Sequence, residues 1–522
     1  MPTTIIKDII AANEGNQPEA FQFLTEPEPA ISYFDHLFAI DLRALAALRI
    51  WLGTIVILFL FNQMGSIDLL YSDQGILPQG LNRQLLGGGF WSLLWLNGPI
   101  GDIRLILIAT GLIAGAYTVG YQTKLMNLLL LVLLWSIQMR NPLILTGGDV
   151  LLRMLLFWTL FLPVNMVWSV DASQSETKND RWKIANVATV AIMLQIVFMY
   201  FFTGIAKLNA FWLNGDAIEY AMNLEMSVKP IGRWLSGYPQ LMYIGTIATI
   251  CAEILTLFLM FIPRINLFNR GMFLGFFLML HVVIWMTLSI GLFSLTAIGA
   301  WLVFVPSDVF NTFFGQPVGF DEKQFYRPRF ELAGRITNIV AGFFLVYVAL
   351  QNLLLVFLPP QSLGTLQLFG RATMTIQQFH MFAKPPLFSP WFEYNAQLDS
   401  GERVDIFYPE RGNTIVKPES VYEYMQTQNW RRIHWNLITH PVYPPASELV
   451  YREIRKRVLL AMIKRWDREN SDDPVFKAKF LCHLDPIKIG DEESRPKFAN
   501  HKHHDLTWAV YESGEDAQSL RD

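Results

Sequence analysis

Long apolar stretches recur through the first 360 residues of the chain. A hydrocarbon core about 30 Å thick needs roughly 20 consecutive apolar residues in one helix. Two of the stretches are short, and the seventh and eighth nearly touch. We predict an α-helical polytopic membrane protein with eight or nine transmembrane helices, and we favour nine. The candidate spans are Ala44–Met64, Ile103–Tyr121, Leu125–Met139, Val150–Trp168, Ile184–Thr203, Met242–Ile262, Met272–Ile290, Leu292–Pro306 and Ile336–Leu358.

The composition agrees with a membrane protein. Hydrophobic residues make up 52% of the chain and charged residues 16%, whereas soluble proteins carry about 25% charged residues. The 16 Trp and 39 Phe residues suit a protein that is anchored at bilayer interfaces. A net charge of −3 gives no indication of a nucleic-acid partner. Two cysteines, Cys251 and Cys482, cannot form a disulfide framework.

The pattern changes after the last apolar stretch. The segment 403-RVDIFYP-409 resembles a strand, and apolar residues recur at helical spacing in 446-ASELVYREIRKRVLLAMIKRWDREN-470. We predict a small α/β C-terminal soluble domain and a loosely structured tail from Ser471. The segment 501-HKHHD-505 suggests either a metal site or, the interpretation we favour, a solvated polar tail. The predicted divisions are 1–40, an N-terminal segment; 41–310, a transmembrane domain; 311–358, a basic loop and last helix; and 359–522, the soluble domain and tail.

Basic residues indicate the orientation in the membrane. If the N-terminus is cytoplasmic, the inside loops contain Lys124, then the 178–183 cluster, Arg264 with Arg270, and the 323–335 cluster. The outside connections contain fewer basic residues, so the positive-inside rule favours this orientation. No signal-peptide pattern precedes the first span. With nine spans the C-terminal domain lies outside the cytoplasm, and with eight it lies inside.

Ionisable side chains within the spans are the leading functional candidates. A charge at mid-bilayer costs at least about 2.5 kcal/mol, so such a residue normally faces a partner or a cavity. The candidates are Arg49, Arg153, Lys207, Glu253 and His281, with Asp149 at a span edge.

Lys207 lies at the exit of the fifth predicted span, in 199-MYFFTGIAKLNAFWLNG-215. Tyr200, Thr203, Gly204 and Lys207 follow the i, i+3, i+4, i+7 rule and therefore share one helix face. A lysine in a desolvated pocket can act as a neutral base, because burial disfavours its charged form. The alternative is a lysine whose ammonium group extends to the membrane interface.

The other candidates have structural alternatives. His281 could hydrogen-bond a neighbouring helix, and Glu253 requires a partner or a proton. Asp149 and Arg153 are four residues apart and are expected to pair with each other. The turn 140-RNPLILTGGD-149 is irregular, and such backbone is tolerated near a membrane only against protein or a water-filled cavity. We expect it to line or cap the same pocket.

Several segments together resemble the HTTM family, the bacterial membrane proteins related to vitamin K-dependent γ-carboxylase. The resemblance covers roughly 41–306 and extends more loosely to 436, so the transmembrane domain 41–310 is HTTM-like. The segments are 41-DLRALAALRIWLG-53, 71-YSDQGILP-78, 120-GYQTK-124, 140-RNPLILTGGDVLLRMLLFWTLFLP-163, 168-WSVDA-172, 200-YFFTGIAKLNAFWLNGDAIEYAM-222, His281 with 290-IGLFS-294, 378-QFHMFAKPP-386 and 429-NWRRIHWNL-437.

The resemblance implies a chemistry. In the animal carboxylases, the segment similar to 204-GIAKLNAFWLNG-215 carries a lysine pair, and the second lysine is implicated in deprotonating vitamin K hydroquinone. Lys207 stands at that position here, and Ala206 replaces the first lysine. The implied cofactors are reduced vitamin K or another quinol, with O2 and CO2, in a γ-glutamyl carboxylase-like lyase. The catalytic candidates are Lys207 and His281. The pocket candidates are Arg140, Asp149, Arg153, Tyr200, Trp212 and Glu253.

Two functional hypotheses remain open. The first is an HTTM-type enzyme that uses Lys207 as a base on a quinol or peptide substrate, with the bacterial plasma membrane as its location. The second is a non-catalytic scaffold or a peptide-maturation or export partner, in which the buried charges only hold helices together. The partners are membrane lipid and a peptide or protein substrate, without nucleic acid or a metal. An ion-coupled transporter is disfavoured because the spans contain few polar residues.

Overall fold

The computed structural model describes most of the chain. The described residues are 33–96, 100–175, 182–262, 266–317, 331–379, 382–411, 417–439, 448–487, 489 and 504–513. The predicted N-terminal segment 1–40 therefore lies largely outside them. Residues 501–503 of the histidine-rich segment also lie outside them.

Within the described residues, five helices are long and apolar enough to cross a membrane. They are α3 (Leu42–Met64), α10 (Val187–Ala206), α14 (Pro239–Leu259), α15 (Asn266–Thr287) and α18 (Glu331–Phe357). A sixth span is formed if α16 (Phe293–Ala300), η5 (Trp301–Phe304) and α17 (Ser307–Phe314), which bend by 98° at a break, are taken together. The chain is thus a helical membrane protein, and the count of eight or nine spans stays a prediction.

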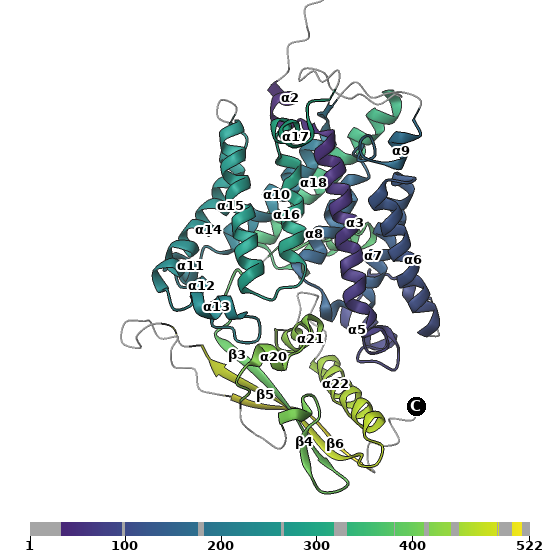
Figure 1. Ribbon diagram of the computed structural model, residues 1–522, viewed down its shortest axis with the longest axis vertical. Coiled ribbons are helices and arrows are strands. Elements are labelled where there is room, and N and C mark those ends of the chain that lie inside the picture. Colours follow the sequence, from purple (N-terminus) through teal and green to yellow (C-terminus); the bar gives the residue numbers. More distant parts are fainter. Residues whose placement is uncertain are drawn as a thin grey trace, which may run out of the picture.

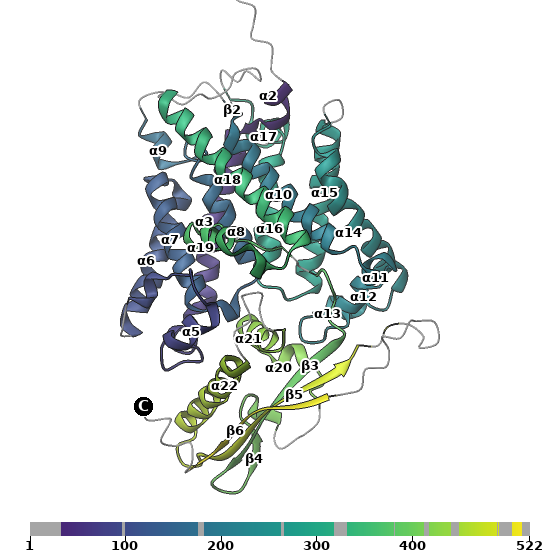
Figure 2. The ribbon, with the colours of Figure 1, turned by 180° about the vertical axis from the view of Figure 1, so that it is seen from behind.

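Three shorter helices lie in the same bundle. They are α6 (Ile100–Val119), α7 (Thr123–Arg140) and α8 (Gly147–Thr159). Figures 1 and 2 show α3, α6 and α7 together on one side of the bundle, with α14 and α15 on the other and α8, α10 and α16 between them. Helix α18 crosses the back of the bundle, beside α10 (Figure 2). Buried Leu, Ile, Trp and Phe side chains of these helices form one continuous core.

Short elements occupy the two ends of the bundle. Near the first residues of α3 lie α2 (Tyr33–Phe38), β1 (Ile40–Asp41), α9 (Val170–Ser173), β2 (Lys183–Ile184) and α17. β1 pairs with β2 in an antiparallel two-stranded ribbon. The remaining short elements are α4 (Ile67–Tyr71), α5 (Gln79–Leu86), η2 (Leu93–Trp95), η3 (Pro142–Ile144), α11 (Ala210–Leu213), α12 (Ala217–Met222) and α13 (Pro230–Leu235).

The C-terminal part forms a four-stranded antiparallel sheet in the order β4-β3-β5-β6. The strands are β3 (Phe388–Leu398), β4 (Arg403–Asp405), β5 (Val475–Pro486) and β6 (His504–Glu512). The helical elements are η7 (Pro409–Arg411), α20 (Val421–Tyr424), α21 (Gln428–Thr439) and α22 (Glu448–Glu469). The predicted α/β domain and its long helix are confirmed. The loosely structured tail expected from Ser471 is wrong, since β5 and β6 provide two strands of the sheet.

The sheet domain lies at the opposite end of the bundle from α2 (Figure 1). Helix α21 joins it to the membrane part, because the Asn436 amide donates to Leu143 O at 2.6 Å and the Arg432 guanidinium donates to Leu145 O at 2.6 Å. Both carbonyls belong to the irregular turn after α7. The turn is therefore covered by α21, against protein rather than lipid.

An extended segment connects the last span to the sheet through the interior of the bundle. After α18, the chain forms η6 (Pro360–Leu363) and α19 (Gly364–Ala372). We call the following residues 373–383 the strap; 380 and 381 are outside the described residues. Arg153 on α8 donates to Met374 O and Ile376 O at 2.9 and 2.6 Å. Gln195 on α10 donates to Gln377 Oε1 at 2.7 Å. The strap's polar groups thus find partners inside the bundle, as buried backbone requires.

Candidate functional site

The candidate site is an ion pair between α10 and α14. Lys207 follows the last residue of α10 and is 3% exposed, and Glu253 on α14 is 4% exposed. Lys207 Nζ lies 2.5 Å from Glu253 Oε1. It also lies 4.5 Å from the centre of the Trp212 ring, within the range of a cation–π interaction. The ammonium group therefore does not extend to the membrane interface.

Gly204 allows these two helices to approach closely. A Cβ atom built at Gly204 would lie 2.9 Å from the Ile254 side chain and 3.1 Å from Glu253 Cβ. Ordinary contacts are wider, so a larger residue here would push α14 away. Tyr200, Thr203, Gly204 and Lys207 are all buried on the face of α10 that the sequence pattern predicts. The group that packs against Gly204 is helix α14.

A second group of buried polar side chains is centred on Tyr200, which lies on α10 about two helical turns before Lys207. The Tyr200 hydroxyl lies 2.7 Å from His281 Nε2 on α15 and accepts a hydrogen bond from Trp301 Nε1 at 3.0 Å. Because the hydroxyl already accepts from Trp301, its proton is available to His281 Nε2. This arrangement assigns the imidazole proton to Nδ1. His281 lies within electrostatic range of the Lys207 ammonium.

Two buried polar atoms at this site have no hydrogen-bond partner among the described residues. They are His281 Nδ1 and Glu253 Oε2. One is a donor in the tautomer assigned above, and the other is an acceptor. A buried polar atom without a partner costs about 1–3 kcal/mol. Such atoms also occur elsewhere in the described residues.

The strap closes one side of the site. Trp212 Nε1 donates to Phe382 O at 2.8 Å, and the Asn209 amide donates to Ala383 O at 2.8 Å. Thr203 Oγ1 makes a longer contact of 3.4 Å with Phe379 O. The indole ring beside Lys207 is therefore held by backbone from a segment more than 160 residues later in the chain.

The remaining predicted pocket residues lie elsewhere. Asp149 accepts hydrogen bonds from Thr146 N and Thr146 Oγ1 at 2.7 Å, which forms a capping box at the start of α8. Arg153 donates to the strap and to Gln138 Oε1. The expected pairing of Asp149 with Arg153 is replaced by these contacts. Arg140 donates to Leu77 O at 2.7 Å and pairs with Asp73 at 3.1 Å.

Arg49, the other ionisable residue predicted within a span, serves a structural role. Its guanidinium is fully buried and donates to the backbone carbonyls of Thr118, Val164 and Trp168. Thr118 lies in the last turn of α6, and Val164 and Trp168 lie in the connection between α8 and α9.

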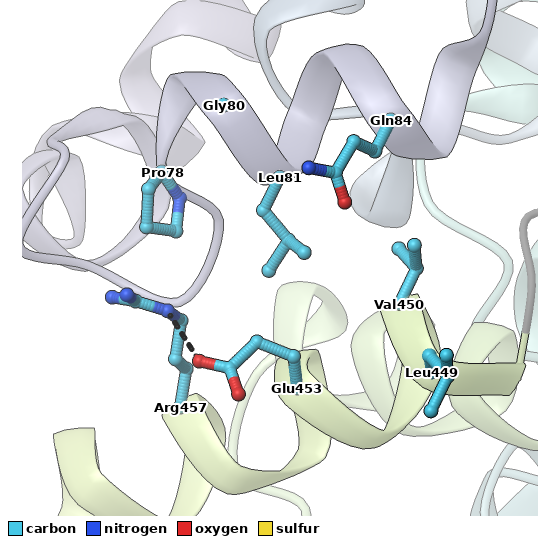
Figure 3. A pocket seen from close by; sticks show the side chains of 8 residues that line it. All are labelled: Pro78, Gly80, Leu81, Gln84, Leu449, Val450, Glu453 and Arg457. Atoms are coloured by element: carbon cyan, nitrogen blue, oxygen red, sulfur yellow. Dashed lines mark hydrogen bonds and ion pairs between the residues drawn. The ribbon is translucent and has the colours of Figure 1, made fainter.

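Two surface cavities are formed by other parts of the chain. Figure 3 shows the first, of about 490 Å³, between α5 and α22; Leu81 and Gln84 face Val450 and a Glu453–Arg457 ion pair. The second, of about 440 Å³, lies between α12 and the start of α14 and contains Tyr243. Neither includes Lys207 or His281. Within the described residues, no group of three His, Cys, Asp or Glu side chains is placed to hold a metal ion.

The sequence reasoning missed two contributors. Trp301 carries no charge and lies in a predicted span, so nothing marked its indole N–H as a partner of Tyr200. The strap acts mainly through backbone carbonyls, which every residue has. Its presence could have been suspected from the two adjacent glutamines in 375-TIQQF-379, the second of which begins a segment of the family resemblance.

The fold and the site define a class: a helical membrane protein with a buried acid–base pair between two spans and a small sheet domain at one end. The model of the HTTM domain matches residues 38–308, which is more than half of the chain. The protein therefore belongs to the HTTM family, which is related to vitamin K-dependent carboxylase. No curated protein and no solved structure matches the chain.

Proposed function

We propose that the protein is an HTTM-type membrane enzyme in which Lys207 and Glu253 remove a proton from a lipid-soluble or peptide substrate. The observation that carries this proposal is the pair itself: an ammonium and a carboxylate 2.5 Å apart, both almost completely buried. Structural ion pairs also occur inside proteins, but buried charges are costly and are concentrated at functional sites.

The pair can provide a base through one internal proton transfer. Burial disfavours the charged form of both groups, so the Lys207 ammonium can pass its proton to Glu253 and become a neutral amine. The amine then takes a proton from a substrate X–H, which leaves the X⁻ anion beside a renewed ammonium group. His281 Nδ1–H lies within the same buried region and would stabilise that anion by hydrogen bonding.

The family relationship makes a quinol the first substrate to consider. Glu253 Oε2 and His281 Nδ1, which have no partner among the described residues, are the acceptor and the donor that a quinol hydroxyl would need. When bound, reduced vitamin K or another quinol would supply, with O2, a strong base for carboxylation of a glutamyl side chain by CO2. The residues that would hold it are Lys207, Glu253 and His281, and the Trp212 ring would exclude water from the amine.

We further propose nine spans, a cytoplasmic N-terminus and a sheet domain on the outer side of a bacterial plasma membrane. The distribution of basic residues supports the orientation. The position of α2 and the sheet domain at opposite ends of the bundle supports an odd number of crossings. Labelling of a single cysteine placed on β4 with an impermeant reagent in intact cells tests this orientation. Protection of that cysteine until the cells are lysed would contradict it.

Lys207→Arg is the sharpest test of the base. Arginine keeps the positive charge for Glu253 but cannot give up its proton in a protein. We expect a folded, membrane-inserted protein with activity lowered at least about 100-fold, the usual contribution of general base catalysis. Mass spectrometry of host peptides and lipid-soluble compounds, with and without the protein, identifies the modified molecule without assuming carboxylation.

Lys207→Ala serves as the companion variant. Loss of the modification in both variants, with normal expression of Lys207→Arg, supports the proposal. Full modification by Lys207→Arg would show that Lys207 is not the base. No protein-dependent difference in either set of molecules would favour a non-catalytic role in which the pair joins α10 to α14.

A further inference from the structure

Three segments that are distant in sequence meet where the membrane part joins the sheet domain. They are residues 225–233 around the start of α13, residues 285–291 after α15, and residues 420–431 of α20 and α21. Backbone bonds join the first two, from Lys229 N to Thr287 O at 2.8 Å and from Ser289 N to Ser227 O at 2.7 Å. The third is attached by Arg431 and Gln428, which both contact Ser289. Figure 1 shows α13 next to α20 and β3 at this seam.

Two of the three segments bring cations to the seam: the first contributes Lys229 and Arg233, and the third contributes Arg431. Lys229 Nζ donates to Trp285 O at 2.6 Å. Arg233 Nη2 donates to Ser420 Oγ at 2.9 Å. Arg431 donates to Tyr422 O at 2.8 Å and to Ser289 Oγ at 3.3 Å, and it stacks on the Tyr422 ring at 4.1 Å. All of these partners are neutral.

None of the three cations is paired with a carboxylate among the described residues. Two carboxylates near the seam, Glu225 and Asp485, are both paired with Lys417, at 2.6 and 2.9 Å. Only 6% of the surface of Arg431 is exposed, and its Nε atom has no hydrogen-bond partner among the described residues. A buried guanidinium without a counter-charge is costly, so an anion at this position would stabilise the folded protein.

The cations also repel one another. Burial and the neighbouring Arg431 guanidinium both lower the pKa of Lys229. A like charge nearby disfavours the charged form of a group, and an opposite charge at the same place would offset this cost. Because Arg431 belongs to the sheet domain and Lys229 to the membrane part, the missing anion would also join the two.

The surroundings place this cluster at the surface of the bilayer. Large apolar side chains project outward beside it: Trp234 is 64% exposed, Trp285 50% and Ile231 43%. Trp285 also lies under Lys229, with 5.4 Å between Nζ and the ring centre. Trp and Tyr gather at the level of lipid headgroups, where an aromatic ring meets apolar chains on one side and water on the other. Cations at that depth meet phosphate groups.

We propose that Lys229, Arg233 and Arg431 form a binding site for the phosphate of an anionic phospholipid, at the seam between the membrane bundle and the sheet domain. Arg233 and Lys229 contact the headgroup from the exposed side, and Arg431 provides the buried guanidinium. The acyl chains of the lipid lie along the outer surface of α13 and α15, beside Trp234 and Trp285. The proposal does not depend on any reaction at Lys207.

The test uses the full-length protein in a neutral detergent and counts bound lipids by native mass spectrometry. Dioleoyl phosphatidylglycerol is titrated against phosphatidylcholine with the same acyl chains, and inorganic phosphate forms a third arm. We expect phosphatidylglycerol to bind preferentially. The Lys229→Gln/Arg233→Gln double variant should bind it about tenfold more weakly, equivalent to about 1.4 kcal/mol. Arg431 is left unchanged because it is buried.

Lys464→Gln/Arg468→Gln is the matched control. These two exposed cations of α22 have the same i, i+4 spacing and lie away from the seam. The control should bind phosphatidylglycerol as the native protein does. Equal weakening in both double variants would show a general charge effect and overturn the site. Equal binding of both lipids, or occupation by inorganic phosphate in place of lipid, would overturn the assignment of an anionic phospholipid.

Discussion

At the scale of single residues, the pairing of Lys207 with Glu253 determines how both behave. Each charge is buried, and each is tolerable because the other lies beside it. Removing one partner of a buried pair leaves an uncompensated charge and typically costs 3–5 kcal/mol, whereas replacing both by neutral groups of similar size is often close to neutral. The stability of single and double variants therefore separates the contribution of the pair from that of each residue.

We predict that Glu253→Gln destabilises the protein by about 3 kcal/mol, because the Lys207 ammonium loses its counter-charge in a water-poor site. The Lys207→Met/Glu253→Gln double variant should recover most of this loss while remaining inactive. Unfolding of the detergent-solubilised protein, followed by circular dichroism, measures both effects in one double-mutant cycle. If the single variant is as stable as the native protein, Lys207 and Glu253 are each already neutral in the folded protein.

At the scale of elements, the contact of α10 with α14 depends on Gly204, which has no side chain. The distance from a Cβ at Gly204 to the Ile254 side chain, 2.9 Å, leaves no room for a larger residue. The same contact sets the distance between Lys207 and Glu253, which lie on these two helices. Packing and chemistry are therefore coupled at this position.

We predict that Gly204→Leu destabilises the protein by about 1–3 kcal/mol through overpacking. It should also separate the two charged residues and lower activity. Gly275→Leu, on α15, is the control, because a Cβ there meets no atom within 4 Å. Midpoints of thermal unfolding for the two variants provide the comparison. Similar midpoints would mean that α14 moves away without cost.

The elements differ in how far the sequence could reveal them. The face Tyr200–Lys207 followed from helical spacing, and the acid opposite it was one of the few charges available within the spans. The backbone contacts of the strap could not be predicted, since a carbonyl such as Phe382 O leaves no mark in the sequence. Strand β5 was missed although buried Ala478, Phe480 and Cys482 alternate along it, because the lysines at 477 and 479 resembled those of a solvated tail.

At the scale of the whole molecule, we expect the stability of the sheet domain to depend on pH through the buried side chain of His434. His434 Nδ1 lies 2.7 Å from Trp430 O and Nε2 lies 2.7 Å from the Tyr394 hydroxyl, so the ring donates at one nitrogen and accepts at the other. Burial lowers the pKa of His434 from 6.5 to about 4, against the opposing effect of the Trp430 carbonyl. The folded domain thus keeps the neutral ring while the unfolded chain takes up a proton.

We predict that this histidine contributes stability that is present above pH 6.5 and is lost as the pH falls toward 4, by about 3 kcal/mol in total. Urea midpoints at pH 7 and pH 5, read from protease cleavage within the sheet domain, measure the loss. His434→Gln should be less stable at pH 7 and show a smaller difference between the two pH values. An unchanged pH dependence in that variant would assign the effect to other groups.

The strap lies outside the range that the HTTM model matches, but residues within that range bind to it. The match ends at residue 308, yet Arg153, Gln195 and Trp212 within it are held by Met374 O, the Gln377 side chain and Phe382 O. A protein cut after α18 would retain every predicted span, but these three side chains would lose their hydrogen-bond partners in the strap. The last strap residues also lead directly into β3. The unit that folds, and that must be expressed, swapped or truncated as one piece, is therefore the bundle together with its strap, and the limits of sequence similarity do not mark it.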